Sequence, residues 1–254
     1  MKARCRDLGT MDYAACWELQ RRLFDGLAAA KKGAQTEDGM QDPADETVGT
    51  VLLVEHPPVY TLGKSGRAEN LLVDRAALER LGARFFHIDR GGDITFHGPG
   101  QLVCYPILDL ERIGIGLREY IARLEEAVIR TVARYGIAAG RIAGASGVWI
   151  GGPDTRFGDT AASGSTGEPE RNGIPRKICA IGVRSSRFVT MHGFALNVAT
   201  DLGWFSRINP CGFSDRGVTS IARETGRTVA MEEVKQLMLR ELEQQLDIEV
   251  KMER

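Results

Sequence analysis

The chain has 254 residues, of which 43% are hydrophobic and 26% are charged, a mixture typical of a water-soluble globular protein. Its 33 Lys and Arg residues nearly balance its 34 Asp and Glu residues, so no excess positive charge is present to bind nucleic acid or anionic lipid. The first residues lack the pattern of a signal peptide, and no stretch approaches the roughly 20 apolar residues of a membrane span, so we expect a cytoplasmic protein with neither nucleic acid nor membrane as a partner.

The first half of the chain alternates helical and strand patterns. Apolar residues at helical spacing predict a helix over Tyr13–Leu27, which Thr10 or Asp12 can cap. The run Thr50–Val54 predicts a first strand of the sheet.

A short helix and two further strands are predicted next. Asp74–Leu81 has a helical pattern ended by Gly82, and Phe85–Asp89 has the pattern of a strand. After a Gly-rich loop, Gln101–Leu110 also reads as a strand. Pro106 within it cannot donate a hydrogen bond to a neighbouring strand, which indicates an edge strand or a bulge.

The second half adds two helices and a hairpin. Apolar residues from Leu117 to Tyr135 recur every three or four positions, and Gly136 follows where a helix should end. We expect strands over Gly147–Ile150 and Lys177–Val183 to pair as a hairpin, and a helix over Val234–Leu246. Helices interleaved with strands indicate an α/β or α+β domain with a mixed sheet.

Two polar segments interrupt these patterns. Residues 31–47 show no apolar period, and residues 151–175 contain six Gly and three Pro. Neither can pack a core of its own, so we expect both to be flexible insertions. The length of the chain fits one domain spanning residues 1–254.

The Gly-rich segment Arg90–Gln101 is a candidate binding loop. It carries four glycines and His97 between two predicted strands. A tight connection would explain one or two of the glycines. Several together let the backbone approach a ligand closely and direct N–H groups toward it, so we favour a binding loop.

Lys177 is unusual because period two places it on the same strand face as Cys179, Ile181 and Val183. One interpretation is structural, with the stem on the core and the ammonium group in water. In the other, a partly desolvated ammonium group has a lowered pKa and can act as a base.

Five cysteines lie far apart, without the close pairing of a disulfide framework, so we expect reduced thiols. Cys211 differs from the others because Pro210 and Gly212 place it in a turn, where a thiol is accessible and can be a nucleophile. We expect Cys16, Cys104 and Cys179 to be core thiols, because Cys104 and Cys179 lie within apolar strand patterns and Cys16 lies beside Trp17 on a predicted helix.

Two other kinds of site are poorly supported. Gly63-Lys64-Ser65 resembles the end of a phosphate-binding P-loop, but Pro58 stands where the first glycine would have to be. The histidines are not spaced as in known metal sites, and we expect no metal. They are His56, His87, His97 and His192.

Five segments, taken in order, resemble the lipoyl(octanoyl) transferase family, also called lipoate-protein ligase B. They are Glu55-His56-Pro57-Pro58-Val59-Tyr60-Thr61-Leu62-Gly63, Arg90 to Gln101, Lys177 to Val183, His192-Gly193-Phe194-Ala195-Leu196-Asn197-Val198 and Ile208-Asn209-Pro210-Cys211-Gly212. The resemblance implies a mixed sheet flanked by helices, like the catalytic domain of biotin and lipoate ligases. The segments 31–47 and 151–175 exceed what the family core requires.

The resemblance also implies roles for particular residues. Cys211 would carry the acyl group, and Lys177 would activate its thiol. The acyl site would be lined by Arg90, Gly91, Gly92, Asp93, Ile94, Thr95, Phe96, His97, Ala180, Ile181, Gly182, Gly193, Phe194 and Ala195.

The implied reaction is octanoyl transfer from the phosphopantetheine of acyl carrier protein to a lysine of a lipoyl domain. The acceptors would be lipoyl domains of 2-oxoacid dehydrogenase E2 subunits and the glycine cleavage H protein. No cofactor is expected, and the protein is expected to be a monomer.

Three alternatives remain open at this point. One is an ATP-dependent lipoate or biotin ligase on the same fold. Another is a non-catalytic module that binds acyl carrier protein. The third is a cysteine hydrolase in which His97 or His192 serves as the base.

Overall fold

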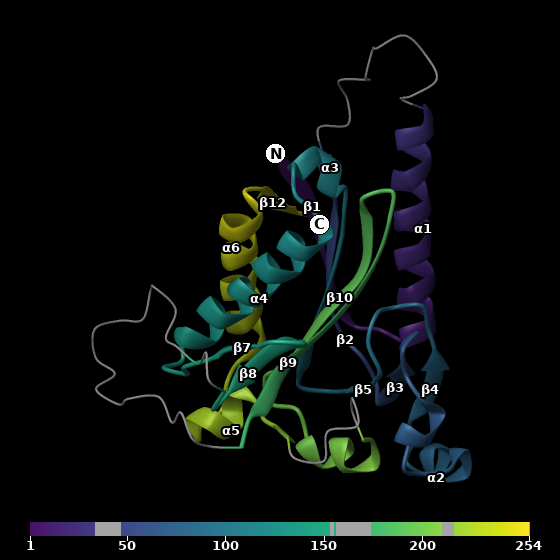
Figure 1. Cartoon of the computed structure of the whole chain (residues 1–254), viewed down its shortest axis with the longest axis vertical. Helices are drawn as coiled ribbons and strands as arrows, with labels where there is room; N and C mark the ends of the chain where they lie inside the picture. The colour runs from purple at the N-terminus through teal and green to yellow at the C-terminus, as the bar shows by residue number, and fades with distance from the viewer. Residues whose placement is uncertain (34–46, 153–154, 156–173, 210–215, 254) are drawn as a thin grey trace.

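A computed structural model describes residues 1–33, 47–152, 155, 174–209 and 216–253 (Figure 1). The helices are α1 (Tyr13–Gly33), α2 (Arg75–Arg80), α3 (Leu110–Ile113), α4 (Leu117–Ala133), α5 (Ile221–Thr225) and α6 (Met231–Leu246), with short 3-10 turns at η1 (Ala68–Asn70) and η2 (Leu202–Arg207). The strands are β1 (Lys2–Thr10), β2 (Thr47–Glu55), β3 (Val59–Leu62), β4 (Arg84–His87), β5 (Ile94–His97), β6 (Gln101–Leu108), β7 (Gly140–Ile142), β8 (Ala145–Ile150), β9 (Arg176–Ser186), β10 (Val189–Asn197), β11 (Gly217–Val218) and β12 (Glu249–Met252).

The described strands form two sheets. The larger runs in the order β12-β1-β2-β6-β10-β9-β8-β7, with β11 added parallel to β9. Strand β1 is parallel to both neighbours, whereas β2, β6, β10, β9 and β8 pair antiparallel. The predicted mixed sheet flanked by helices is therefore confirmed.

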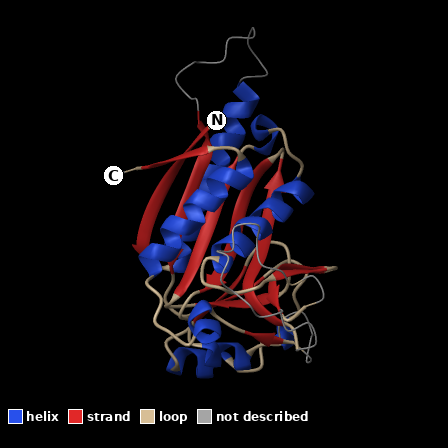
Figure 2. Cartoon of the chain, turned by 90° about the vertical axis from the view of Figure 1, so that its left-hand side faces the viewer, coloured by secondary structure: helices blue, strands red, loops and turns tan. Residues whose placement is uncertain are grey.

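Helices cover both faces of the larger sheet, with α4 and α6 on one side and α1 on the other (Figures 1 and 2). Period two sorts the side chains of β2 between two cores: Val51 and Leu53 pack on the face of α4 and α6, and Leu52 and Val54 on the face of α1. Because both faces are buried, β2 reads in sequence as a continuous apolar run.

The smaller sheet, in the order β4-β3-β5, has its own core. Tyr60 and Phe96 lie at its centre and pack against Trp204 of η2. The start of the Gly-rich segment lies between β4 and β5 of this sheet, and a hydrogen bond from Gly91 N to Val183 O of 3.1 Å joins it to β9 of the larger sheet.

The predicted helices form where their end signals stand. Asp12 caps α1 by accepting hydrogen bonds from Ala14 N and Ala15 N at 2.9 and 3.3 Å. Asp74 caps α2 in the same way, and Gly136 after α4 has the left-handed φ of 74° that favours glycine. The predicted hairpin of β8 with β9 is also confirmed.

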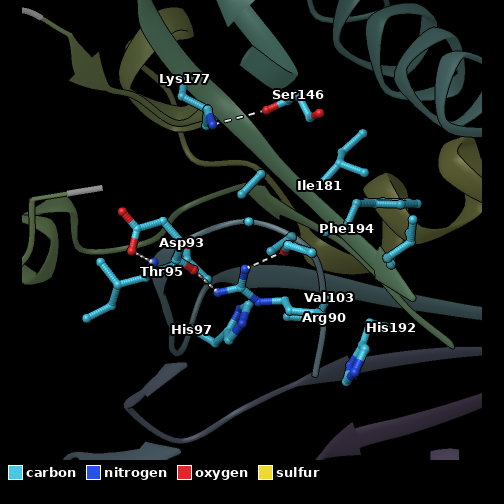
Figure 3. Close-up of a pocket in the computed structure, with 18 of the residues that line it drawn as sticks. Arg90, Asp93, Thr95, His97, Val103, Ser146, Lys177, Ile181, His192 and Phe194 are labelled. Atoms are coloured by element: carbon cyan, nitrogen blue, oxygen red, sulfur yellow. Dashed lines mark hydrogen bonds between the residues drawn. The ribbon is translucent and has the colours of Figure 1, made fainter. Parts of the chain in front are cut away.

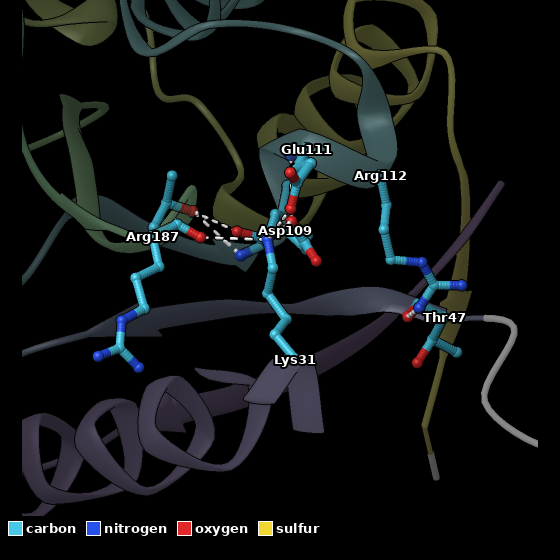
Figure 4. Close-up of polar contacts among 8 residues, drawn as sticks. Lys31, Thr47, Asp109, Glu111, Arg112 and Arg187 are labelled. Carbon is cyan, nitrogen blue, oxygen red and sulfur yellow. Dashed lines mark hydrogen bonds and ion pairs between the residues drawn. The ribbon is translucent and has the colours of Figure 1, made fainter. Parts of the chain in front are cut away.

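Helix α1 is longer than predicted. Residues 31–33, expected within a flexible insertion, form its last turn. Lys31 Nζ lies 2.7 Å from Asp109 Oδ1 and 2.7 Å from Glu111 Oε2, and it donates to Arg187 O at 3.1 Å (Figure 4). These long-range partners, which no local pattern reveals, stabilise the end of the helix.

The expectation that Pro106 marks an edge strand or a bulge was wrong, because β6 lies in the middle of the sheet and its register with β2 continues through Pro106 without a shift. The ladder between β10 and β6 stops at Phe194 opposite Cys104, short of the proline. Beyond it, the Thr190 hydroxyl accepts from Leu108 N at 3.0 Å and donates to Pro106 O at 2.8 Å. Proline is tolerated there because hydrogen bonds of the Thr190 side chain take the place of the missing backbone ladder.

Of the two predicted insertions, residues 34–46, 153–154 and 156–173 lie outside the described residues, and so does Cys211. Thr47, expected at the end of the first insertion, begins β2. The helices that the structure describes include none long and apolar enough to cross a membrane.

Candidate active site

A cavity of about 500 Å³ opens between β9, β10, the Gly-rich segment and the start of α4 (Figure 3). Most of the residues predicted to line an acyl site line this cavity. They are Arg90, Gly91, Gly92, Asp93, Ile94, Thr95, His97, Ala180, Ile181, Gly182, Gly193, Phe194 and Ala195.

Phe96 is placed differently. Its ring stacks on Trp204 with centroids 5.1 Å apart and an interplanar angle of 5°, in the core of the smaller sheet. Because side chains alternate along β5, Thr95 and His97 face the cavity while Phe96 turns away from it. The structure therefore gives Phe96 a packing position rather than a place in the cavity wall. The segment was also predicted as a loop, but four of its residues form β5.

Small residues on two neighbouring strands leave room for the cavity. Gly182 pairs with Gly193, and Ala180 pairs with Ala195. A Cβ atom added to Gly182 would lie 2.7 Å from Gly91 O, and one on Gly193 would lie 2.1 Å from Cys104 O. Glycine is required at both positions because backbone approaches backbone there.

Arg90 holds the Gly-rich segment in place from inside. Its Nη2 donates to Thr61 O at 2.8 Å and to Asp93 O at 2.7 Å, and its Nη1 donates to Gly91 O at 2.9 Å. The side chain is 8% exposed. The guanidinium group is thus used to fix the shape of its own loop.

Lys177 lies at the opposite end of the cavity from His192 (Figure 3). Its Nζ donates to Ser146 O at 3.1 Å and lies 4.5 Å from the centroid of the Trp149 ring. The guanidinium group of Arg216 lies 5.3 Å from the same centroid. A backbone carbonyl and an aromatic face therefore hold the ammonium group beside the cavity. In the purely structural interpretation, the ammonium group would only extend into water.

Ile181 and Val183 line the cavity with Lys177, and both also pack against the main core that contains the buried Cys179, as the predicted shared face requires. The register of β8 with β9 shifts between Val148 and Trp149, so a bulge lies between Lys177 and Cys179.

Two buried histidines lie along the cavity. Burial, and then the neighbouring His56, lowers the pKa of His97 to about 3, so its ring is neutral. Burial also lowers the pKa of His192, whose Nε2 lies 2.9 Å from Asp89 Oδ1. The hydrogen bond from His192 lowers the pKa of Asp89 to about 2, so a neutral His192 donates its Nε2–H to a carboxylate.

The described cysteines are core thiols, as predicted for Cys16, Cys104 and Cys179. All four, including Cys5, are buried. Burial raises the pKa of Cys5 to about 12 and that of Cys16 to about 12, and it raises the pKa of Cys104 and Cys179 further. A thiolate is therefore unfavourable at all four.

The prediction that Cys211 is a nucleophile lies outside the described residues. The flanking chain is described on both sides: Asn209 N donates to Asn70 O at 2.8 Å, and Arg216 lines the cavity beside Lys177. Within the described ranges, no group of three His, Cys, Asp or Glu side chains could hold a metal ion.

Sequence reasoning missed several residues that line the cavity. Trp149 could have been noticed as a bulky partner of Lys177 in the predicted hairpin. Gln101 and Asn197 stood in recognised segments but were not assigned to the site. Other residues come from distant segments and carry no local signal, among them Tyr13, Leu117, Ile121 and Arg216.

The fold and the cavity define a catalytic domain of the lipoyl ligase class. The chain belongs to the family described as lipoyl protein ligase A/B catalytic domain, whose model matches residues 12–243. A solved lipoate-protein ligase A bound with ATP superposes with a TM-score of 0.62 at 17% identity, covering 100% of this chain and 89% of that one. A bi-partite lipoate protein ligase from Thermoplasma acidophilum gives 0.61 at 17% identity, covering 100% and 87%. The fold expected from the resemblance is confirmed by these ligases.

Sequence comparison is more specific. The octanoyltransferase of Bacteroides fragilis is 49% identical over 242 residues, covering 95% of this chain and 97% of that protein. The octanoyltransferase of Flavobacterium johnsoniae is 46% identical over 250 residues, covering 98% of each. These relatives match along nearly their whole lengths.

Proposed function

We propose that this protein is an octanoyltransferase of lipoate biosynthesis. It transfers an octanoyl group from octanoyl-acyl carrier protein to a lysine of lipoyl domains, which belong to 2-oxoacid dehydrogenase E2 subunits and the glycine cleavage H protein. The observation that carries the proposal is the 49% identity to an octanoyltransferase over 95% of this chain and 97% of the relative.

The cavity suits an acyl chain. Its volume of about 500 Å³ lies within the range of small-molecule sites. Apolar side chains from α4, β9 and β10 form part of its wall: Leu117, Ile121, Ile181 and Phe194. Burial of each methylene group of an octanoyl chain would contribute about 0.8 kcal/mol.

In the first step, Lys177 accepts the proton of the Cys211 thiol or stabilises the thiolate as its counter-ion. The thiolate attacks the carbonyl carbon of the incoming thioester and forms a tetrahedral oxyanion. The carbon–sulfur bond to the carrier then breaks, and the carrier thiol leaves with a proton. The product is an octanoyl thioester on Cys211.

In the second step, the amine of the target lysine attacks the Cys211 thioester. An amide bond forms, the Cys211 sulfur leaves, and the amine loses a proton. Because an amide is more stable than a thioester, the transfer needs neither ATP nor another cofactor. Two substrates that use one cysteine in turn give ping-pong kinetics.

Two alternatives differ in what they require of the site. An ATP-dependent ligase needs groups that bind phosphate, but the Arg90 guanidinium is hydrogen-bonded to backbone carbonyls of its own loop and of Thr61 in β3. A hydrolase with His97 as base needs a ring that takes up a proton near neutral pH, and burial lowers the pKa of His97 to about 3.

One experiment separates these functions. The protein is mixed with octanoyl-acyl carrier protein and a lipoyl domain, and the mass of the domain is followed with and without ATP. We expect octanoylation without ATP and no pyrophosphate exchange with octanoate. Pyrophosphate exchange would establish the ligase, and release of free octanoate without domain modification would establish a hydrolase. We further propose that the protein acts in the cytoplasm as a monomer. Sedimentation of the purified protein tests its oligomeric state.

A further inference from the structure

A chain of buried hydrogen bonds runs along the cavity from His97 to β11. His97 Nδ1 lies 2.8 Å from Gln101 Oε1, and Gln101 Nε2 donates to Asn197 Oδ1 at 2.9 Å. Asn197 Nδ2 donates to Thr219 O at 3.0 Å. All three side chains line the cavity and are at most 6% exposed.

The direction of every bond in this chain is fixed by backbone carbonyls, which can only accept. Asn197 must turn its NH₂ group toward Thr219 O, so its oxygen faces Gln101. Gln101 Nε2 also donates to Phe96 O at 3.1 Å, so both of its hydrogens are used and its oxygen faces His97. His97 Nδ1 must therefore carry the proton.

The other nitrogen of His97 is then a bare acceptor. It lies 3.4 Å from the hydroxyl oxygen of Thr61, which itself accepts from Arg90 Nη2 at 3.1 Å. Thr61 is thus the donor to His97. Hydrogen bonds consequently lead from the guanidinium group that shapes the Gly-rich loop, through His97, to the larger sheet.

At its far end the chain reaches the backbone of Lys177. Thr219 N donates to Lys177 O at 3.0 Å, and the neighbouring Val218 pairs with Lys177 in the parallel ladder of β11 and β9. Asn197 therefore donates to the carbonyl oxygen of Thr219, the same residue whose N–H group donates to Lys177 O. The loop that lines the cavity and the strand that carries the lysine are joined by side chains from β5, β6 and β10.

We propose that His97, Gln101 and Asn197 are positioning residues that fix the position of Lys177 relative to the Gly-rich segment. This inference rests on the proposed function. Fully paired polar chains in a buried site have one arrangement and resist displacement. Displacement of a reacting group by about 1 Å can cost roughly 100-fold in rate. The chain is suited to this role because it ends on the backbone of Lys177 rather than on a surface loop.

The variant Asn197→Asp tests this inference, because a carboxylate has no hydrogen to donate to Thr219 O. The matched control is Thr131→Val in α4, which removes a buried hydroxyl bond to Ala127 O of 2.8 Å at a residue that does not line the cavity. The single-turnover rate of octanoyl transfer to the enzyme, the affinity for octanoate and the unfolding temperature are measured for both.

We expect Asn197→Asp to slow single-turnover acylation by about 10- to 100-fold, while octanoate affinity stays near that of the wild type. Thr131→Val is expected to lower the unfolding temperature but to keep the wild-type rate. A wild-type rate in Asn197→Asp would overturn the inference, and so would a rate loss matched by an equal loss of octanoate affinity.

Two NMR measurements test the inference without a measurement of enzymatic activity. The ¹⁵N shifts of wild-type His97 should show a proton on Nδ1 and none on Nε2, and the reverse tautomer would contradict the chain. Amide exchange of Thr219, whose N–H bonds Lys177 O, should accelerate in Asn197→Asp, and unchanged protection would also contradict it. If the wild type transfers no octanoyl group, the proposed function fails while these two results still stand or fall by themselves.

Discussion

The ammonium nitrogen of Lys177 lies 4.5 Å from the centroid of the Trp149 ring, on the neighbouring strand of the sheet. Together with the hydrogen bond to Ser146 O, this contact holds a long, flexible side chain in one place beside the cavity. A cation over an aromatic face at a solvent-exposed position is stabilised by about 0.5 to 1 kcal/mol. The lysine is thus fixed before any substrate arrives.

Replacement of Lys177 tests its role as activator. Lys177→Met keeps the length of the stem but removes the charge, and we expect single-turnover acylation to fall by about 100- to 10,000-fold. Lys177→Arg separates two mechanisms, because arginine keeps a positive charge but cannot accept a proton. Partial activity in the arginine variant indicates charge stabilisation, and none indicates a base. Near wild-type acylation in Lys177→Met would exclude Lys177 as activator.

Gly182 is predicted to be irreplaceable for binding of the acyl group. In Gly182→Ala, the new methyl group would lie 2.7 Å from Gly91 O, so it must displace the Gly-rich segment that lines the cavity. We expect the KM for octanoyl carrier protein to rise by about tenfold or more, equivalent to about 1.4 kcal/mol. Steady-state kinetics measure it.

The matched control is Gly26→Ala in α1, where an added Cβ meets nothing within 4 Å. Alanine there should stabilise the protein by up to about 1 kcal/mol and leave KM unchanged. An unchanged KM in Gly182→Ala would show that the loop and strand have more freedom than their spacing indicates.

Acid should destabilise the fold through His56 and His97. Burial lowers the pKa of His56 to about 4 and that of His97 to about 3, from an ordinary 6.5. The two histidines therefore bind protons more readily in the unfolded chain. The free energy of unfolding has its full value above pH 6.5 and falls as the pH drops toward the pKa values of the folded state. Each histidine contributes a slope of about 1.4 kcal/mol per pH unit.

Urea unfolding between pH 7 and pH 5 measures this slope. His56→Gln removes one titrating group, and glutamine still offers hydrogen-bonding atoms toward Met11 O and the Tyr105 hydroxyl. Its stability should depend less on pH than that of the wild type. Parallel pH dependences in the two proteins would show that His56 does not contribute.

Lys31 is expected to stabilise the end of α1. Burial alone would lower its pKa, but hydrogen bonds to Asp109 and Glu111 outweigh that effect and raise it. Lys31→Met would leave Asp109, whose side chain is 2% exposed, without this partner, and should cost about 2 kcal/mol. Because the pKa is raised, the contribution of Lys31 is present at neutral pH and is lost as the pH rises through that pKa.

Chemical denaturation of Lys31→Met beside Lys64→Met, a change at an exposed lysine, measures the difference. Equal stability of the two variants at pH 7 would contradict a role for the Lys31 cluster.

Features encoded over short stretches were predictable from sequence. Gly136 follows the end of α4 and Asp74 caps α2, and both signals depend on residues close in the chain. Strands β8 and β9 pair across the 151–175 insertion, and each was recognisable from its own apolar run. The Gly-rich segment and the strand of Lys177 were also recognised as candidate site elements.

Features that depend on distant partners were not predictable. Pro106 sits in a central strand only because the Thr190 hydroxyl replaces part of the ladder, and Thr190 lies far along the chain. The strand β5 has four residues inside a Gly-rich segment, too few for a clear period. Phe96 was assigned to the cavity with its neighbours, although alternation along β5 turns it toward Trp204.

The central claim is that Cys211 carries the octanoyl group. The purified protein is mixed with octanoyl-acyl carrier protein in the absence of acceptor, digested under mildly acidic conditions, and analysed by mass spectrometry, with Cys211→Ser in parallel. We predict one added octanoyl group on the peptide that contains Cys211, removed by hydroxylamine and absent from Cys211→Ser. An octanoyl group on another residue, or full transfer to lipoyl domain by Cys211→Ser, would contradict the account.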